Sequence, residues 1–237
     1  MRSLYVPNLC LGCFELPEYE ARHAIKALRA RVGDMFLLID GKGNHAVGKI
    51  VEVLKRTCII EVAAVNSDPA PSPSLTMIVC PTKQAERFEW FLEKAVEIGV
   101  DRVIPAWCKR SEKKVEKFDR WNKVLVSAMK QSQRTWLPVL EPACSLKVAL
   151  ELTTESEILC VAHCMSPLEG AKKHLLRALS KNESACVAIG PEGDFTEDEV
   201  RLMIEQGGVE ISLGDSRLRT ETAALSAVTY FRALQSI

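Results

Sequence analysis

The chain lacks any long hydrophobic run and any overall excess of one charge. No stretch of its 237 residues approaches the roughly 18 consecutive apolar residues of a membrane-spanning helix. Its start, Met-Arg-Ser-Leu-Tyr-Val-Pro-Asn, is interrupted too early for the apolar part of a signal peptide. Lysine plus arginine and aspartate plus glutamate both number 31. We therefore expect a cytoplasmic globular protein with no membrane partner, whose total charge neither indicates nor excludes nucleic-acid binding.

Several familiar chemical motifs are also missing. The chain has no phosphate-binding loop with its lysine and no dinucleotide-binding glycine fingerprint, which disfavours a nucleoside triphosphate or a nicotinamide cofactor. No serine sits in a Gly-x-Ser-x-Gly elbow, and no cysteine lies in a recognisable nucleophile motif. Hydrolysis through a covalent intermediate therefore has no support in the sequence.

The cysteines do not form a disulfide or metal pattern. Nine cysteines are spread from Cys10 to Cys186, an odd number that favours reduced and mostly buried thiols. Cys10 and Cys13 resemble half of a zinc site, and residues 160–164 could supply the other half. That pairing lacks the usual spacing, so we expect no metal.

The first 65 or so residues favour a small β-rich module. Apolar runs at residues 4–6, 34–39, 46–54 and 58–65 predict strands, and residues 40–44 predict a turn. Residues 18–30 carry apolar side chains at helical spacing and predict one helix. A proline-rich stretch at residues 66–74 then predicts a domain boundary, giving domains at residues 1–70 and 75–237.

The second domain shows strand and helix patterns in alternation. Strands are predicted at residues 75–80, 101–106, 137–140, 157–163, 185–189 and 209–213. Helices are predicted at residues 84–98, 117–132, 145–151, 167–180, 196–206 and 221–235. This order indicates an α/β domain whose parallel sheet is covered on both faces, with ligands bound beyond the carboxyl ends of its strands.

Two glycine-containing strand-to-helix joints are the best candidates for a binding site. Ile189 to Thr196 and Leu213 to Ala223 each follow an apolar run and enter a helical pattern. In the first joint, Gly190 and Gly193 permit positive φ and close backbone approach, and Thr196 and Glu199 have capping-box spacing. In the second, Thr220 suits an N-cap. The pair indicates a ligand held by backbone amides and an apolar slot.

A basic segment precedes these joints. Between Arg102 and Arg134, ten basic residues outnumber three acidic ones. Such a local excess suits phosphate backbones, although a solvated helix and loop surface explains it equally well. Gln131 and Arg134 at the end of the predicted helix suit hydrogen bonds to a base or phosphate, and an arginine is also favoured there by the helix terminus itself.

Taken together, these motifs resemble a known family. Gly190-Pro191-Glu192-Gly193, Leu213-Gly214 and Leu218-Arg219-Thr220-Glu221-Thr222-Ala223 are similar in order and spacing to the RsmE-type 16S ribosomal RNA uridine-N3 methyltransferases of the SPOUT superfamily. The chain departs from that pattern at Asp194, where the family usually has glycine, and at Asp215, where it usually has proline.

The resemblance implies more than the residues alone indicate. It implies a PUA-like β-barrel that binds RNA, followed by an α/β domain with a deep trefoil knot, and a homodimer. It also implies S-adenosylmethionine, bound among loops at about residues 163–169, 189–194 and 213–222, and 16S ribosomal RNA in the 30S subunit as the partner.

Roles for individual residues follow from that resemblance. The expected cofactor contacts lie in the two joints: Gly190, Pro191, Glu192, Gly193, Leu213, Gly214, Leu218 and Thr222. Arg219 is expected to hold the base or stabilise its anion, with Glu221 or Glu192 as the proton acceptor, and Arg219 could instead only pair with an acidic neighbour. Lys109, Arg110, Gln131 and Arg134 are the expected contacts to substrate RNA.

Two other functions remain open. A non-catalytic RNA-binding protein would keep the basic segment and the β-rich module but would not bind S-adenosylmethionine. A transferase that uses another nucleotide on an unknotted sheet would bind that nucleotide instead.

Overall fold

The chain folds into two compact units. The computed structural model describes residues 1–153 and 158–236. The first unit comprises Met1–Ala70 and Val126–Leu137, and the second comprises Pro71–Leu125 and Pro138–Ile237. Helix α3 (Phe118–Ser132) begins in the second unit and ends in the first. Within the described residues, no helix is long and apolar enough to cross a membrane.

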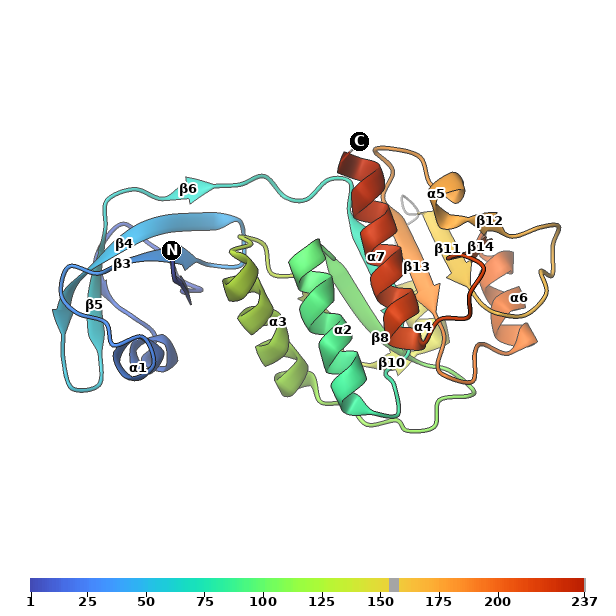
Figure 1. Ribbon diagram of the computed structural model, residues 1–237, viewed down its shortest axis with the longest axis horizontal. Helices are drawn as coiled ribbons and strands as arrows, with labels where there is room; N and C mark the ends of the chain where they lie inside the picture. The colour runs from blue at the N-terminus through green and yellow to red at the C-terminus, as the bar shows by residue number, and fades with distance from the viewer. Residues whose placement is uncertain (154–157, 237) are drawn as a thin grey trace. The chain divides into compact units, whose positions relative to one another are not determined.

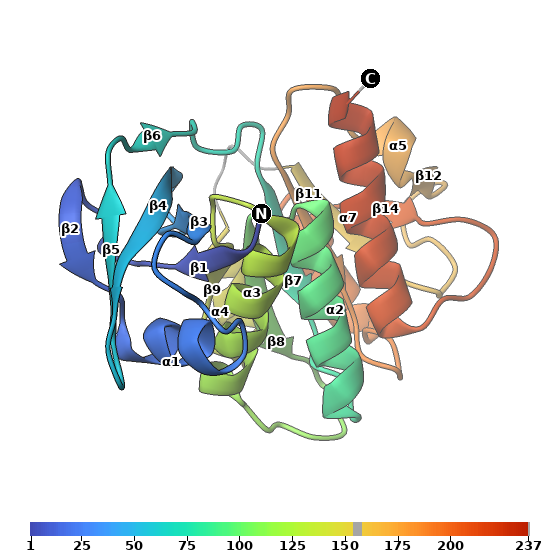
Figure 2. The same ribbon diagram turned by 60° about the vertical axis from the view of Figure 1, so that its left-hand side comes forward.

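The first unit is a six-stranded sheet with one helix. Its elements are β1 (Ser3–Tyr5), β2 (Gly12–Glu15), α1 (Glu18–Lys26), β3 (Met35–Ile39), β4 (Asn44–Val53), β5 (Cys58–Val62) and β6 (Asn66–Ser67). The strand order is β1-β3-β4-β5-β2, with β6 paired to β4, and Figure 2 shows α1 beside these strands. Alternate strand residues such as Leu38 and Ile60 pack with Ala21 and Ala24 of α1 in one apolar core.

Several local predictions for this unit need correction. The predicted helix at residues 18–30 ends at Lys26, because Arg29 has a φ of 52°, which no right-handed helix contains. The predicted strand at residues 58–65 ends at Val62. Two of the residues assigned to the proline-rich connection, Asn66 and Ser67, form an edge strand.

The second unit is built on an eight-stranded parallel sheet. Its strands are β7 (Leu75–Val79), β8 (Arg102–Trp107), β9 (Val139–Leu140), β10 (Cys144–Ser145), β11 (Ile158–Ala162), β12 (Lys173–His174), β13 (Ala185–Ile189) and β14 (Val209–Ser212). They follow the order β10-β8-β7-β13-β11-β14-β12, with β9 paired to β8. The central strands β7 and β13 are buried along their whole length, as expected for a parallel sheet covered on both faces.

Helices cover both faces of this sheet. They are α2 (Ala85–Ile98), the start of α3, α4 (Leu146–Glu151), α5 (Leu175–Ala178), α6 (Glu197–Glu205) and α7 (Thr220–Ser236). Helices α2 and α7 run side by side, and α7 packs on β7 and β13 (Figure 1). On the other face, side chains from α4 and α6 form an apolar cluster with β7, β8, β11 and β13. The predicted alternation of strands and helices is thus confirmed.

The predicted helix at residues 167–180 is wrong. Most of that range is an irregular loop, followed only by β12 and the short helix α5. Gly170 has a φ of 65°, which no right-handed helix contains, and Glu210 accepts hydrogen bonds from the backbone N–H groups of Leu168 and Glu169. The tertiary contact therefore outweighs the helix propensity of this segment.

Candidate functional site

Three loops at the carboxyl ends of neighbouring strands surround one cavity. Strands β13, β11 and β14 are parallel neighbours, so their carboxyl ends lie at the same edge of the sheet. The cavity measures about 660 Å³. Its lining comprises residues 162–164, 172, 189–192, 194, 211–220 and 223. Its volume falls within the range of small-molecule sites, about 300 to 1,000 Å³.

The structure brings most of the expected cofactor contacts together. The lining of this cavity includes Gly190, Pro191, Glu192, Leu213, Gly214, Leu218 and Arg219. Gly193 lies outside the lining. Glu221 and Thr222 instead line a smaller cavity of about 290 Å³, together with Glu86, Arg87 and Trp90 of α2.

The glycines of the first joint matter because they have no side chain, and neither of them has a positive φ. A Cβ on Gly190 would lie 3.0 Å from the backbone nitrogen of Phe195, and one on Gly193 would lie 3.3 Å from the Cβ of Arg110. The residue with positive φ in this loop is Asp194, at 65°. The expectation of positive φ at the two glycines is therefore wrong, whereas close approach is confirmed. The capping box of Thr196 and Glu199 at the start of α6 is also present.

Asp194 joins two of the three loops. One of its carboxylate oxygens accepts the backbone N–H of Cys164 at 2.7 Å, and the other accepts the N–H of Phe195 at 2.8 Å. A glycine at this position could provide the same φ but neither hydrogen bond. The side chain at this departure from the family pattern therefore fixes the loop after β13 against the loop after β11.

Thr220 joins a second pair of these loops, those after β14 and β13. Its hydroxyl donates to the carbonyl oxygen of Gly190 at 3.1 Å, and both groups are buried. The prediction that Thr220 is an N-cap is wrong, because it is the first residue of α7 and its side chain turns to the neighbouring loop. The first turn of α7 is instead closed by the bond from Ala223 N–H to Arg219 C=O.

A buried polar cluster holds the loop after β11. Glu210 of β14 accepts from His163 Nε2 at 2.8 Å and from two backbone N–H groups of that loop. Lys172 Nζ donates to His163 Nδ1 at 3.1 Å, to His163 C=O at 2.5 Å and to Met165 C=O at 2.6 Å. All three ammonium N–H groups are thus used inside the loop.

The pKa shifts in this cluster follow from its burial. Burial lowers the pKa of His163, and the nearby charge of Lys172 lowers it further. Burial also lowers the pKa of Lys172. For Glu210, burial acts to raise the pKa, but hydrogen bonds from Leu168 N–H, Glu169 N–H and His163 outweigh it and leave the pKa lowered. The cluster is therefore an ionised carboxylate, a neutral imidazole carrying its proton on Nε2, and an ammonium group.

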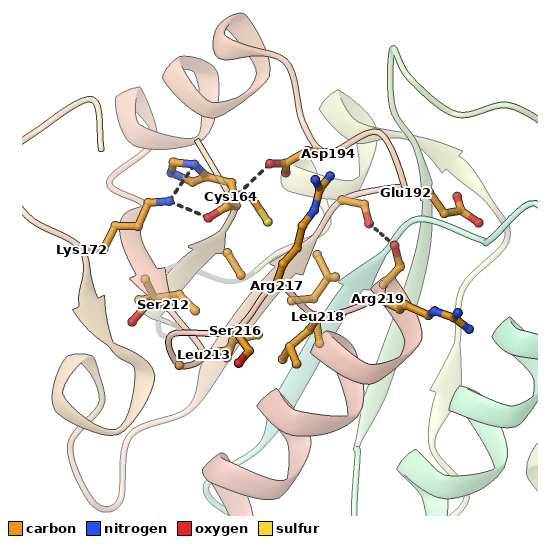
Figure 3. A pocket seen from close by; sticks show the side chains of 18 of the residues that line it. Cys164, Lys172, Glu192, Asp194, Ser212, Leu213, Ser216, Arg217, Leu218 and Arg219 are labelled. Atoms are coloured by element: carbon orange, nitrogen blue, oxygen red, sulfur yellow. Dashed lines mark hydrogen bonds between the residues drawn. The ribbon is translucent and has the colours of Figure 1, made fainter. Parts of the chain in front are cut away.

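Two arginines project from the loop between β14 and α7. Figure 3 shows Arg217 extending toward Asp194, while Arg219 points away from Arg217. Both are exposed. Among the described residues, neither guanidinium makes an ion pair, so the simple pairing with Asp215 or Glu221 is absent. Their charges remain available for a ligand at the cavity.

The two carboxylates considered as proton acceptors occupy different places. Glu192 lines the larger cavity, and one of its oxygens accepts the backbone N–H of Lys83 at 2.9 Å. Glu221 is buried beside α2, with Oε1 3.8 Å from Arg87 Nε, and its Oε2 has no hydrogen-bond partner among the described residues. Glu192 therefore lies at the larger cavity, whereas Glu221 belongs to the first turn of α7 and lines the smaller one.

The basic segment is partly committed to internal contacts. Arg102, Lys109 and Arg120 pair with Glu141, Asp198 and Glu89, respectively. Arg110 donates to the backbone carbonyls of Gly193 and Phe195. Within the described chain, Lys113, Lys114 and Lys117 are exposed and form no ion pair. In the first unit, Gln131 is exposed and Arg134 is half-buried at the end of α3.

Lys172 of the cavity wall was not singled out from the sequence, and Cys164 also lines the cavity. No sequence motif marks Lys172, because two of its three partners are backbone carbonyls. In the described residues, no group of three or more His, Cys, Asp and Glu side chains is arranged to hold a metal ion.

Comparison with known proteins places this geometry in a family. Residues 69–232 match the family model of an RNA methyltransferase domain, and residues 16–63 match that of an RNA methyltransferase PUA domain. The chain is 29% identical over 229 residues to ribosomal RNA small subunit methyltransferase E of Bacillus subtilis (strain 168), covering 92% of this chain and 90% of the relative.

Solved structures agree with the sequence comparison. A probable rRNA-methyltransferase from Porphyromonas gingivalis superposes with a TM-score of 0.91 and 33% identity, covering 100% of this chain and 99% of the other. A ribosomal RNA small subunit methyltransferase E from Neisseria gonorrhoeae bound to S-adenosyl methionine superposes with a TM-score of 0.87 and 29% identity, over 99% and 98% of the two chains. The chain therefore belongs to the family of proteins with an RNA methyltransferase domain.

Proposed function

We propose that this protein transfers the methyl group of S-adenosylmethionine to N3 of a uridine in 16S ribosomal RNA. The observation that carries this proposal is the single cavity formed by three loops at the carboxyl ends of β11, β13 and β14, in a chain of the RNA methyltransferase family. Two similar structures, from Neisseria gonorrhoeae and Legionella pneumophila, contain this cofactor. The named small-subunit methyltransferases among the relatives support the choice of RNA.

The residues of the cavity fit the proposed cofactor. Gly214 has a φ of 129°, and a Cβ there would meet nothing within 4 Å, so its backbone is open to a ligand. Leu213 and Leu218 offer apolar surface for an adenine ring, and the carboxylates of Glu192 and Asp194 suit a group that carries positive charge. When bound, S-adenosylmethionine supplies an electrophilic methyl group on its sulfonium.

The protein's own task is to prepare the acceptor nitrogen. N3 of uridine carries a proton, so a base must remove it as N3 is aligned with the methyl carbon. We assign Arg219 to hold the base and stabilise its developing negative charge, and Glu221 or Glu192 to accept the proton. A thiol nucleophile is not required, because the reacting atom is a nitrogen with its own lone pair once deprotonated.

RNA contacts are proposed on both units. The exposed Lys113, Lys114 and Lys117 offer positive charge to the phosphate backbone from the loop after β8, together with Lys109, whose ammonium group also pairs with Asp198. Gln131 and Arg134 offer hydrogen-bond donors at the end of α3. We propose residues 1–70 as a PUA-like β-barrel domain that binds RNA and residues 75–237 as the methyltransferase domain.

The finer architecture is part of the same proposal. We infer a deep trefoil knot in the second domain. It is supported by the pairing of β14 with β11 on the side away from β13, while the following α7 returns to pack on β7 and β13. Chains rarely thread their own loops, so this inference rests also on the family resemblance. We further infer a homodimer that acts in the cytoplasm on the 30S subunit.

The test is methylation of a defined substrate. The purified protein is incubated with labelled S-adenosylmethionine and 30S subunits that lack the modification, and the RNA is digested to nucleosides for mass spectrometry. We expect label in N3-methyluridine. Label in another nucleoside would reject the assignment to N3, and absence of label with folded protein and competent subunits would reject the enzyme.

Calorimetry separates the alternatives. Binding of S-adenosylmethionine is expected without RNA, because the cavity is formed within one unit. A non-catalytic RNA-binding protein would give no heat with the cofactor but would retain RNA binding. A transferase with another donor would bind a different nucleotide at this cavity.

A further inference from the structure

Arg110, which the sequence suggests as an RNA contact, is directed at the loop that forms one wall of the cavity. It lies just after β8, and its Nη1 donates to Gly193 C=O at 2.9 Å and to Phe195 C=O at 3.2 Å. These two carbonyls flank Asp194. A guanidinium bridging them fixes the backbone on both sides of the residue that contacts Cys164.

The turn that carries Arg110 is itself held in place. Ser111 Oγ accepts the N–H of Cys108 at 2.8 Å, and Glu199 Oε1 accepts the N–H of Lys109 at 2.7 Å. Glu199 is buried and belongs to the capping box of α6. The Arg110 side chain therefore starts from a fixed backbone, so less conformational entropy is lost when its two hydrogen bonds form.

Gly193 and Arg110 are matched in shape. A Cβ on Gly193 would lie 3.3 Å from Arg110 Cβ and 3.5 Å from Arg110 Cδ. Gly193 does not have positive φ, so its lack of a side chain serves to admit the Arg110 stem. The aliphatic part of Arg110 packs on Gly193 while its guanidinium reaches the carbonyls beyond it.

The loop has two sides with different tasks. Gly190, Glu192 and Asp194 line the cavity, whereas Gly193 does not, and Arg110 is likewise outside the lining formed by the described residues. Contacts from Arg110 therefore reach the loop at positions that the cavity does not use. Arg110 is therefore placed to hold the loop in position rather than to contact a ligand directly.

We propose that Arg110 is a positioning residue of the cofactor cavity. Its guanidinium sets the path of residues 193–195, and thereby the place of the Asp194 carboxylate against the loop after β11. This inference rests on the proposed function, since it takes S-adenosylmethionine as the ligand. It gives Arg110 a role in cofactor binding that exists before RNA arrives.

The test measures cofactor affinity without RNA. Isothermal calorimetry with S-adenosylmethionine is carried out on the full chain and on Arg110→Ala, Arg110→Met and Arg110→Lys. We expect Kd to rise about tenfold in the Ala and Met variants, because two charge-assisted hydrogen bonds on a partly solvated side chain are lost. Methionine keeps the aliphatic stem, so an equal loss of cofactor affinity in Arg110→Met and Arg110→Ala would show that the N–H donors matter. Lys keeps a charged donor and should recover most of the affinity.

A matched control and a double-mutant cycle sharpen the result. Arg201→Ala removes an arginine of α6 whose exposed guanidinium pairs with Glu197, and it should leave Kd unchanged. Gly193→Ala should weaken cofactor binding in the parent protein, because the new Cβ presses on Arg110. The same change should have a smaller effect in Arg110→Gly, which removes both Cβ and Cδ of Arg110, the two side-chain atoms that the new Cβ would meet.

The outcomes distinguish this inference from the function on which it rests. Absence of cofactor binding by the parent protein would reject the proposed function. Normal binding by the parent and unchanged Kd in both Arg110→Ala and Arg110→Met would reject the positioning role alone. If the Arg110 variants changed only the KM for RNA, and if this effect were reversed in Arg110→Lys and weakened by salt, Arg110 would instead be a contact to an RNA phosphate.

Discussion

The Thr220 hydroxyl donates to the buried carbonyl oxygen of Gly190, which ties the start of α7 to the loop after β13. Thr220→Val keeps the shape of the side chain but leaves that carbonyl without its donor. We expect a loss of about 1 to 3 kcal/mol in unfolding free energy, with weaker cofactor binding. Chemical denaturation and calorimetry measure the two effects. Thr220→Ser retains the hydroxyl, and a loss as large as that of Val would show that the hydrogen bond is unimportant.

Substitutions at Asp194 should separate its backbone strain from its hydrogen bonds. Asp194→Gly loses both carboxylate contacts but accommodates the φ of 65° freely, whereas Asp194→Ala loses the contacts and keeps the strain. Ala should therefore be less stable than Gly by about 1 kcal/mol. Asp194→Asn keeps one acceptor oxygen and should be the mildest change. Denaturant midpoints give the order, and equal stability of Ala and the parent, which share the strain, would mean that the contacts contribute nothing.

The buried histidine should make the protein less stable in mild acid. The pKa of His163 is lowered below its usual 6.5 by burial and then by Lys172. The unfolded chain therefore binds the proton more readily, and the contribution of the neutral imidazole, complete above pH 6.5, is lost as pH falls through the lowered pKa. Because the pKa of Glu210 is also lowered, from 4.5, its contribution is lost at still lower pH.

Unfolding free energies between pH 8 and pH 5 check this expectation. The parent should lose more stability over that interval than His163→Gln, which cannot titrate there. His23→Gln alters an exposed histidine of the first unit and should behave like the parent. Parallel pH profiles for the parent and His163→Gln would show that His163 does not set the acid sensitivity.

Arg219 should matter for turnover more than for cofactor binding. Its guanidinium is exposed at the cavity and has no ion-pair partner among the described residues. Arg219→Ala should leave the fold and the cofactor Kd within about threefold of the parent, while turnover falls by at least about 100-fold, the scale of losing one group that stabilises developing charge. Single-turnover assays with labelled cofactor measure the chemical step. Turnover at the parent's rate would remove Arg219 from the reaction.

Local patterns predicted most of the elements of the second unit. The apolar run of residues 185–189 and the capping box at Thr196 depend on neighbours within a few positions, so they could be read from the sequence. The loop at residues 163–172 could not, because its structure depends on Glu210, more than 40 residues later. The roles of Arg110 and Thr220 could not be predicted for the same reason, because each side chain binds a backbone carbonyl that is distant in the sequence.

The glycine joints were identified, and one of the two reasons expected for them is right. Gly190 and Gly193 were expected to permit positive φ and close approach, and the structure shows only the second, because they make room for Phe195 and Arg110. The positive φ lies at Asp194, which no local rule assigns. A sequence can thus mark where backbones approach closely without identifying what approaches them.

The buried cluster around Glu210 gives the two proposed binding events different responses to ionic strength. The Glu210 carboxylate is buried, its side chain being 4% exposed, and its partner His163 is neutral and 0% exposed, so mobile ions screen this carboxylate little. The lysines after β8 are exposed, and their attraction to phosphates weakens steeply as counterions compete. Added salt should therefore release RNA while the cofactor stays bound, which makes ionic strength a simple means of studying the cavity by itself.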